Sequence, residues 1–224
     1  MKREISTGLK ILFMTGLVLC LFPGVSFPAD AGKKPESELQ QVLQKAKGRE
    51  KNLKTFVAAF EQTKRTLLLE EPLRSRGMIF FDISGKMLFK VTEPVPLKVL
   101  LKRGWITLFY PKWSKYEERY IGRDVLNKNF GVGRSLDEMA EHYDIVLSPE
   151  RPSGLYRLHL KPKSGRAEKH IDRIEVLLDP ESWLPVSISV MEKEGDVTTI
   201  TLEFKSINEP LPEGIFDLEL PDQR

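Results

Sequence analysis

Lys86-Met87-Leu88-Phe89-Lys90-Val91-Thr92 is the stretch of sequence that decides the fold. Its apolar residues Met87, Phe89 and Val91 occupy every second position. Because successive side chains of a β-strand point to opposite faces, these three share one face, and the lysines lie on the other. Ser84-Gly85, just before this stretch, suits a two-residue hairpin turn. The pattern predicts an amphipathic strand that buries one side of an antiparallel sheet.

The same period of two recurs from Thr55 almost to the end of the chain. Turn sequences such as Glu194-Gly195-Asp196 separate the segments, as in β-hairpins. Closely spaced strands predict a mainly β (α+β) fold, in which about eleven antiparallel strands curl toward a barrel. The predicted strands are residues 55–64, 74–82, 86–91, 97–103, 105–110, 114–121, 143–147, 155–160, 171–178, 184–191 and 197–206.

Two helices are predicted beside this sheet. Residues 38–53 repeat apolar side chains near the 3.6-residue period, and Ser37 suits the N-cap, so we expect this helix to pack on the sheet. Residues 135–142 have a capping box formed by Ser135 and Glu138, which predicts a short second helix. The basic stretch 161–166 is predicted to be a solvated loop.

Residues 1–31 have the layout of a signal peptide: a basic start, an apolar run and small residues at the end. The apolar run, residues 11–22, is shorter than a membrane-spanning helix needs. We therefore expect export to the periplasm, and a single domain in residues 32–224. Cleavage after Ser26 and a retained N-terminal anchor are the alternatives.

Cys20 is the only cysteine, and it lies within this leader. The residue before it, Leu19, is larger than the small residue that lipidation of such a cysteine prefers, so lipidation is the minority interpretation. The processed protein would then have no thiol with which to form a disulfide, act as a nucleophile or bind a metal.

The polar residues show no recognisable reaction centre. His142, His159 and His170 have no second ligand at metal-binding spacing. Ser135, His142 and Asp144 make a triad on paper, but no G-x-S-x-G elbow supports it. A net charge of +3 without a basic stripe argues against nucleic-acid binding. The sequence predicts neither an enzyme nor a cofactor, but a protein that holds something apolar.

A filled core and an open lipid cavity would both show this strand alternation. The predicted interior mixes Phe, Met, Leu and Val, and methionine adapts to ligands of variable shape, which favours a cavity. The short second helix, which carries Met139, would act as a movable lid. The candidate lipid-binding residues are Phe56, Phe60, Met87, Phe89, Val91, Val99, Leu101, Ile106, Leu108, Met139, Val186, Ile188 and Leu202.

Short landmarks follow one another along the whole of the expected mature chain. They are Phe60-Glu61-Gln62, Gly77-Met78-Ile79-Phe80-Phe81, Glu93-Pro94, Leu108-Phe109-Tyr110-Pro111, Gly195-Asp196-Val197-Thr198 and Ile215-Phe216. In their order and spacing they resemble the LolA family of periplasmic outer-membrane lipoprotein carriers. The resemblance implies a half-open β-barrel whose mouth is covered by helices, and transport without a chemical reaction.

The resemblance also implies the partners. The cargo would be acylated lipoproteins, the donor an inner-membrane ABC transporter of the Lol type and the acceptor an outer-membrane receptor, with the carrier a monomer. The chain departs from the family at Ile83-Ser84-Gly85, because relatives have there an Arg-Pro pair whose arginine latches the lid. A carrier of another lipid or glycolipid, or a periplasmic sensor or scaffold on the same fold, remain as alternatives.

Overall fold

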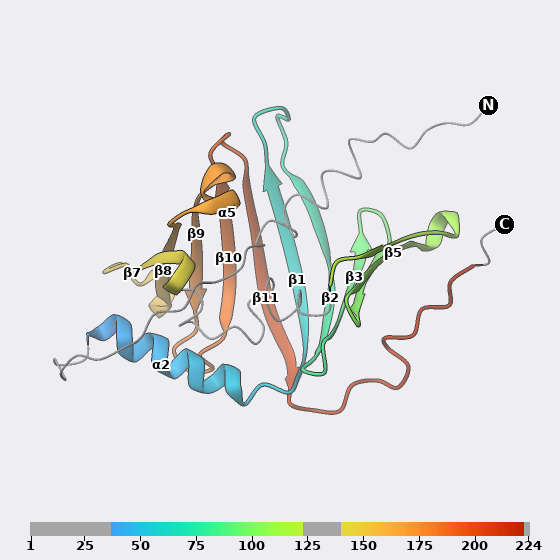
Figure 1. The fold of residues 1–224 in the computed structure, drawn as a ribbon, viewed down its shortest axis with the longest axis horizontal. Coiled ribbons are helices and arrows are strands. Elements are labelled where there is room, and N and C mark those ends of the chain that lie inside the picture. The colour runs from blue at the N-terminus through green and yellow to red at the C-terminus, as the bar shows by residue number, and fades with distance from the viewer. Residues whose placement is uncertain (1–36, 123–139, 222–224) are drawn as a thin grey trace.

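The computed structural model describes residues 37–122 and 140–221. In these residues, eleven antiparallel strands form one sheet in the order β6-β5-β4-β3-β2-β1-β11-β10-β9-β8-β7. The sheet is open and curved, and β6 and β7 are its two edges (Figure 1). The strands are β1 (Thr55–Arg65), β2 (Leu73–Asp82), β3 (Lys86–Glu93), β4 (Leu97–Lys102), β5 (Trp105–Tyr110), β6 (Lys115–Tyr120), β7 (Tyr143–Leu147), β8 (Tyr156–Pro162), β9 (Ile171–Leu178), β10 (Pro185–Glu192) and β11 (Val197–Ile207).

Every predicted strand is present, and the predicted ends differ from the observed ends by at most about two residues, the usual uncertainty of a boundary. The mainly β fold is therefore confirmed. Most of the predicted second helix, including Met139, lies outside the described residues. Its last residues, 140–142, are described and are helical. The leader also lies outside the described residues.

Helix α2 (Glu38–Lys51) confirms the first predicted helix. The Ser37 hydroxyl accepts a hydrogen bond from the Gln40 amide at 3.3 Å, and the Ser37 amide donates to Gln40 Oε1 at 2.9 Å, which makes a capping box. The buried face of α2, with Val42 and Ala46, packs against Leu158 of β8 and other residues of the β7–β10 side. Of the helices that the structure describes, none has the length and apolar character of a membrane span.

The predicted loop at 161–166 is wrong at both ends, because Lys161 and Pro162 belong to β8 and Gly165–His170 forms the short helix α5. Arg, Ala, Glu and Lys are strong helix formers, and this propensity outweighs the basic charge from which a solvated loop was predicted. Two single-turn 3₁₀ helices, η1 (Pro111–Trp113) and η2 (Pro152–Gly154), complete the described elements.

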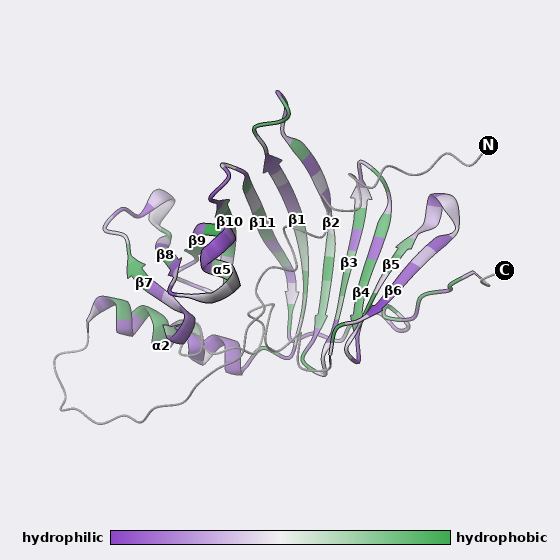
Figure 2. Ribbon diagram, turned by 45° about the horizontal axis from the view of Figure 1, so that its top comes forward, coloured by the Kyte–Doolittle hydropathy of each residue, from purple (hydrophilic) through white to green (hydrophobic). Residues whose placement is uncertain are grey.

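The two faces of the sheet are covered differently. On the outer face, the C-terminal segment after β11 places the buried ring of Phe216 against Phe80, Leu88 and Leu100. Figure 2 shows the alternating hydrophobic and hydrophilic bands along β3 and β4 that separate the two faces. The opposite face, which we call the inner face, carries Phe89 and the residues paired with it across the strands.

Gly77 allows β2 and β3 to approach closely. A Cβ atom at this position would lie 2.0 Å from the carbonyl oxygen of Lys90 and 2.9 Å from the Cα of Val91. Gly77 is also paired with Phe60 of β1, so no side chain separates Phe60 from β3. The rings of Phe60 and Phe89 meet edge to face with their centroids 6.1 Å apart.

Replacing Gly77 with alanine should therefore destabilise the sheet. We expect Gly77→Ala to lower the free energy of unfolding by about 3 kcal/mol, because the backbone of β3 cannot give way cheaply. Urea unfolding measures the change. Gly48→Ala is the matched control, since nothing lies within 4 Å of a Cβ there. Gly48 lies in the last turn of α2, where the higher helix propensity of alanine should stabilise the protein by up to about 1 kcal/mol. Equal effects of the two substitutions would contradict the steric argument.

Candidate functional site

Cross-strand rows join the inner face into one apolar surface. Directly paired residues project from the same face of a sheet. One such row runs from β11 to β5 through six neighbouring strands: Phe204, Ala58, Ile79, Phe89, Val99 and Leu108. At the β6 end of this row Leu108 pairs with the exposed Glu117. The apolar surface therefore stops at the edge strand.

Most of the predicted lipid-binding residues come together in a single cluster on this face. Each of its buried members is at most 9 % exposed, and we call this group the inner cluster. Leu202 of β11 packs against it and is partly buried. The predicted residues that are buried in the inner cluster are Phe56, Phe60, Met87, Phe89, Val91, Val99, Leu101, Ile106 and Leu108.

Three predicted residues lie elsewhere. Ile188 of β10 packs against the second cluster, which α2 covers. Val186 is half-buried and lies at a register irregularity between Pro185 and Ser187, so the pairing does not assign it to the row of Ile188. Met139 lies outside the described residues. A binding role for any of the predicted residues stays a prediction.

The two halves of the inner face differ in what covers them. Over β7–β10, helix α2 contributes Val42 and Ala46 to the second cluster. In the inner cluster, the described residues that do not come from strands are Leu53 and Leu184 among the buried members, both from connecting segments. No helix of the described residues contributes a side chain there. The β1–β5 half is therefore the candidate binding surface, with stacked Phe56 and Phe81 rings 5.0 Å apart.

A polar border closes one end of the inner face. Lys64 continues the inner side of β1 beyond Phe60 and is only 5 % exposed. Its ammonium lies 3.1 Å from Asp196 Oδ2 and 3.7 Å from Glu192 Oε1, both at the β10–β11 hairpin. A charge this buried requires such partners, because an unpaired ion is costly away from water.

Two hydroxyl groups of the same border are buried without a partner. Thr198 pairs with Lys64 across β11 and β1, and Ser75 pairs with Gln62 across β2 and β1. The hydroxyl oxygens of both residues are enclosed and make no hydrogen bond to any residue that the structure describes. The sequence analysis missed this border, although the presence of Lys64 on the same face as Phe56 and Phe60 was the signal for it.

The Asp196 carboxylate is the group with which several residues of the border interact. Burial by itself would raise the pKa of the Asp196 carboxyl, but hydrogen bonds from the Thr66 hydroxyl, the Lys64 ammonium and the Leu67 amide outweigh it, and the pKa is lowered below 3.8. A carboxyl whose pKa is lower in the folded protein stabilises the fold above its unfolded pKa. That contribution disappears as the pH falls through the folded pKa.

The free energy of unfolding should therefore depend on pH through the Asp196 carboxyl. We expect the free energy of unfolding to fall more steeply below about pH 4 in the wild-type protein than in Asp196→Asn, whose amide does not titrate. Urea unfolding across the range from about pH 6 to pH 2.5 measures the difference. Parallel pH profiles for the two proteins would show that the Asp196 carboxyl contributes nothing to this dependence.

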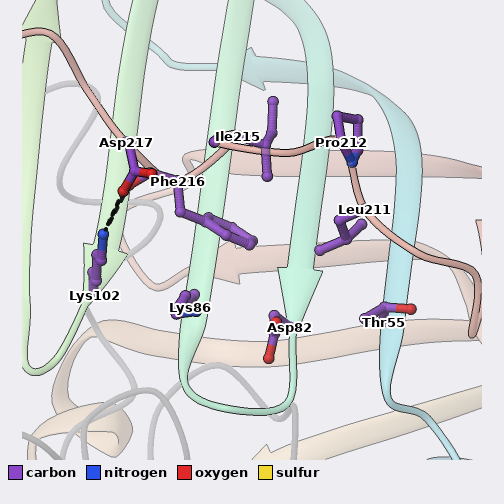
Figure 3. Close-up of a pocket in the computed structure, with 10 residues that line it drawn as sticks. Thr55, Asp82, Lys86, Lys102, Leu211, Pro212, Ile215, Phe216 and Asp217 are labelled. Atoms are coloured by element: carbon purple, nitrogen blue, oxygen red, sulfur yellow. Dashed lines mark hydrogen bonds and ion pairs between the residues drawn. The ribbon is translucent and has the colours of Figure 1, made fainter.

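A separate pocket of about 290 Å³ lies on the outer face (Figure 3). Its sheet side is a cross-strand row formed by Thr55, Asp82, Lys86 and Lys102, and the C-terminal segment lines the rest. Lys102 Nζ donates to Asp217 Oδ1 at 2.9 Å. Its two lysines and two aspartates balance in charge, and none of the predicted lipid-binding residues lines it.

Few other polar groups of the described residues are arranged in a distinctive way. Asp179 accepts hydrogen bonds from the hydroxyl and the amide of Ser182 at 2.6 and 2.8 Å, which lower its pKa. These bonds hold the β9–β10 turn. Within residues 37–122 and 140–221, no group of three or more His, Cys, Asp and Glu side chains is arranged to hold a metal ion. The inner face is thus an apolar surface with one polar end.

Comparison with known proteins identifies the class to which this fold belongs. The family model described as outer membrane lipoprotein carrier protein LolA matches residues 51–219. The chain therefore belongs to the LolA family. A protein of Hahella chejuensis described as an outer-membrane lipoprotein carrier protein is 20 % identical over 173 residues, which is 77 % of this chain and 81 % of that protein.

Solved structures agree on the fold. An uncharacterised conserved protein from Thermus thermophilus aligns with a TM-score of 0.53 at 15 % identity, over 83 % of this chain and 96 % of that one. The lipoprotein LppX of Mycobacterium tuberculosis aligns with a TM-score of 0.50 at 12 % identity, over 79 % of this chain and 99 % of that one. At such identities the likeness concerns the fold alone.

Proposed function

We propose that this protein is a periplasmic carrier that shields the acyl chains of lipoproteins on its inner face and ferries them from the inner to the outer membrane. The observation that carries the proposal is the inner cluster, a continuous apolar surface built by β1–β5 and β11. Membership of the LolA family supports it, as does the description of the Hahella chejuensis relative.

The energetics explain why such a surface is needed. Each methylene group that leaves an apolar environment costs about 0.8 kcal/mol, so a long acyl chain cannot cross an aqueous compartment unshielded. The buried side chains of the inner cluster are at most 9 % exposed, so an acyl chain reaches them only when the cluster opens. Met87 has an unbranched side chain that repacks easily, and it suits such an opening.

The proposal includes partners on both sides of the periplasm. An inner-membrane ABC transporter of the Lol type would load the carrier, and an outer-membrane receptor would unload it, with the carrier acting as a monomer. The leader in residues 1–31 would direct export. Ile83, which occupies the position of the family's latching arginine, is 57 % exposed at the β2–β3 turn. Closure of this carrier would therefore not use that arginine.

A charge placed in the inner cluster should block loading. We expect Phe89→Glu to reduce the binding of a fluorescent fatty-acid probe at least about tenfold, because a carboxylate among buried apolar side chains is costly. Leu202→Glu tests the same surface from a partly buried position that tolerates the change more easily. Circular dichroism checks that both variants stay folded.

Phe109→Glu is the matched control for this experiment. Phe109 lies on the neighbouring strand β5 but pairs with Lys98 on the outer face, where a carboxylate has a cationic neighbour. It should bind the probe as the wild type does. Unchanged probe binding and lipoprotein transfer by folded Phe89→Glu would count strongly against the proposed surface.

Native mass spectrometry of the protein recovered from the periplasm identifies the cargo. The proposal expects a co-purifying acylated protein that Phe89→Glu loses. A free lipid or glycolipid in its place would favour a carrier of another lipid, and the absence of any ligand would favour a sensor or scaffold.

A further inference from the structure

The turn between β1 and β2 displays three consecutive leucines to solvent. Leu67, Leu68 and Leu69 are 81, 90 and 47 % exposed, and Leu68 is the most exposed of the large apolar side chains that the structure describes. This hairpin extends beyond the neighbouring strands (Figure 1). Exposed apolar residues are ordinary when scattered singly, but three in a row at a protruding tip indicate an interaction site.

The backbone amides of this leucine tip have acceptors within the hairpins. The Leu68 amide donates to the Thr66 hydroxyl at 3.4 Å, and the Leu69 amide donates to the Thr66 carbonyl at 3.3 Å. The Leu67 amide donates to the carboxylate of Asp196. These amide partners remove part of the penalty that unpaired backbone groups would add when the tip enters the polar outer region of a bilayer.

The tip is also held in place. Thr66, which accepts the two amide hydrogen bonds, donates its own hydroxyl to Asp196. Asp196 in turn pairs with the buried Lys64, and the Leu67 side chain lies over Gly195 of the β10–β11 hairpin. Because these contacts order the turn in advance, little conformational entropy remains to be lost when the leucines are buried.

We propose that the leucine tip inserts into the interfacial region of a lipid bilayer, an inference that rests on the proposed function and deepens it. Three successive residues around a tight turn point in different directions, so a flat protein surface would cover only some of them. Fluid hydrocarbon surrounds all three. The exposed Glu70 and Glu71 follow directly and limit insertion to the outer part of the bilayer, preferably of zwitterionic lipids.

The position of the tip suits a carrier of acyl chains. Strand β1 connects Phe60 of the inner cluster directly to the leucine tip, by way of the polar border at Lys64. Insertion of the tip brings this end of the inner face to the membrane surface. An acyl chain would then pass between the bilayer and the inner cluster over a short path, with its polar end near Lys64.

Vesicle binding tests this inference. The protein recovered from the periplasm is mixed with phosphatidylcholine vesicles and separated by flotation. The wild type should float with the vesicles, Leu68→Ser should bind about tenfold more weakly, and substitution of all three leucines by serine should abolish binding. Vesicles that contain an equal part of phosphatidylglycerol should bind the wild type less well, because Glu70 and Glu71 are repelled.

Ile83→Ser is the matched control, because Ile83 is an exposed apolar residue at a hairpin on the opposite end of the same sheet. It should float as the wild type does. Failure of the wild type to bind vesicles would overturn the inference and leave the tip to a protein partner. Equal losses in Ile83→Ser and Leu68→Ser, or binding that grows with anionic lipid and disappears in salt, would also overturn it.

The fatty-acid probe separates this inference from the proposed function. Leu68→Ser should bind the probe as the wild type does, since Leu68 lies outside the inner cluster. Probe binding without vesicle binding in the wild type would overturn only the membrane insertion. Vesicle binding without probe binding would support the insertion and contradict the carrier function.

Discussion

The pairing of β1 with β11 is the interaction on which the rest of the structure depends. It joins the first strand to the last, in a register that sets Phe60 opposite Leu202 and Phe56 opposite Ile207. Asn208, in the left-handed conformation that asparagine tolerates, locks this junction. Its side chain accepts from the Lys54 amide at 2.7 Å and donates to the Asn52 carbonyl at 2.8 Å. Without this pairing the sheet would separate into two smaller ones.

This central pairing makes one continuous inner face from two halves of the chain. Helix α2 covers the β7–β10 half, while the β1–β5 half carries the inner cluster. On the outer face, the C-terminal segment covers the apolar patch around Leu88. The two clusters on the inner face are thus assigned to different roles, one closed by a helix and one available, in our proposal, for acyl chains.

The polar contacts at the hairpin end connect the proposed cargo surface with the proposed membrane contact. Lys64 and Asp196 form an ion pair at the border of the inner face, and Asp196 and Thr66 hold the leucine tip. The same few residues therefore define the end of the apolar surface and order the turn beyond it. Such an arrangement would allow a carrier to approach a bilayer with the Lys64 end of its inner face.

The sequence by itself determined the strands, their faces and most members of the inner cluster, since a period of two records which side of a strand avoids water. It did not predict helix α5, the burial of Lys64 or the display of Leu67, Leu68 and Leu69. Helix α5 follows from the local helix propensity of its residues. Only the tertiary structure decided the burial of Lys64 and the ordering of the leucines, because both depend on contacts between residues far apart in the chain. Lys64 is buried since Asp196 meets it from another hairpin, and the leucines are ordered since Thr66 meets the same carboxylate.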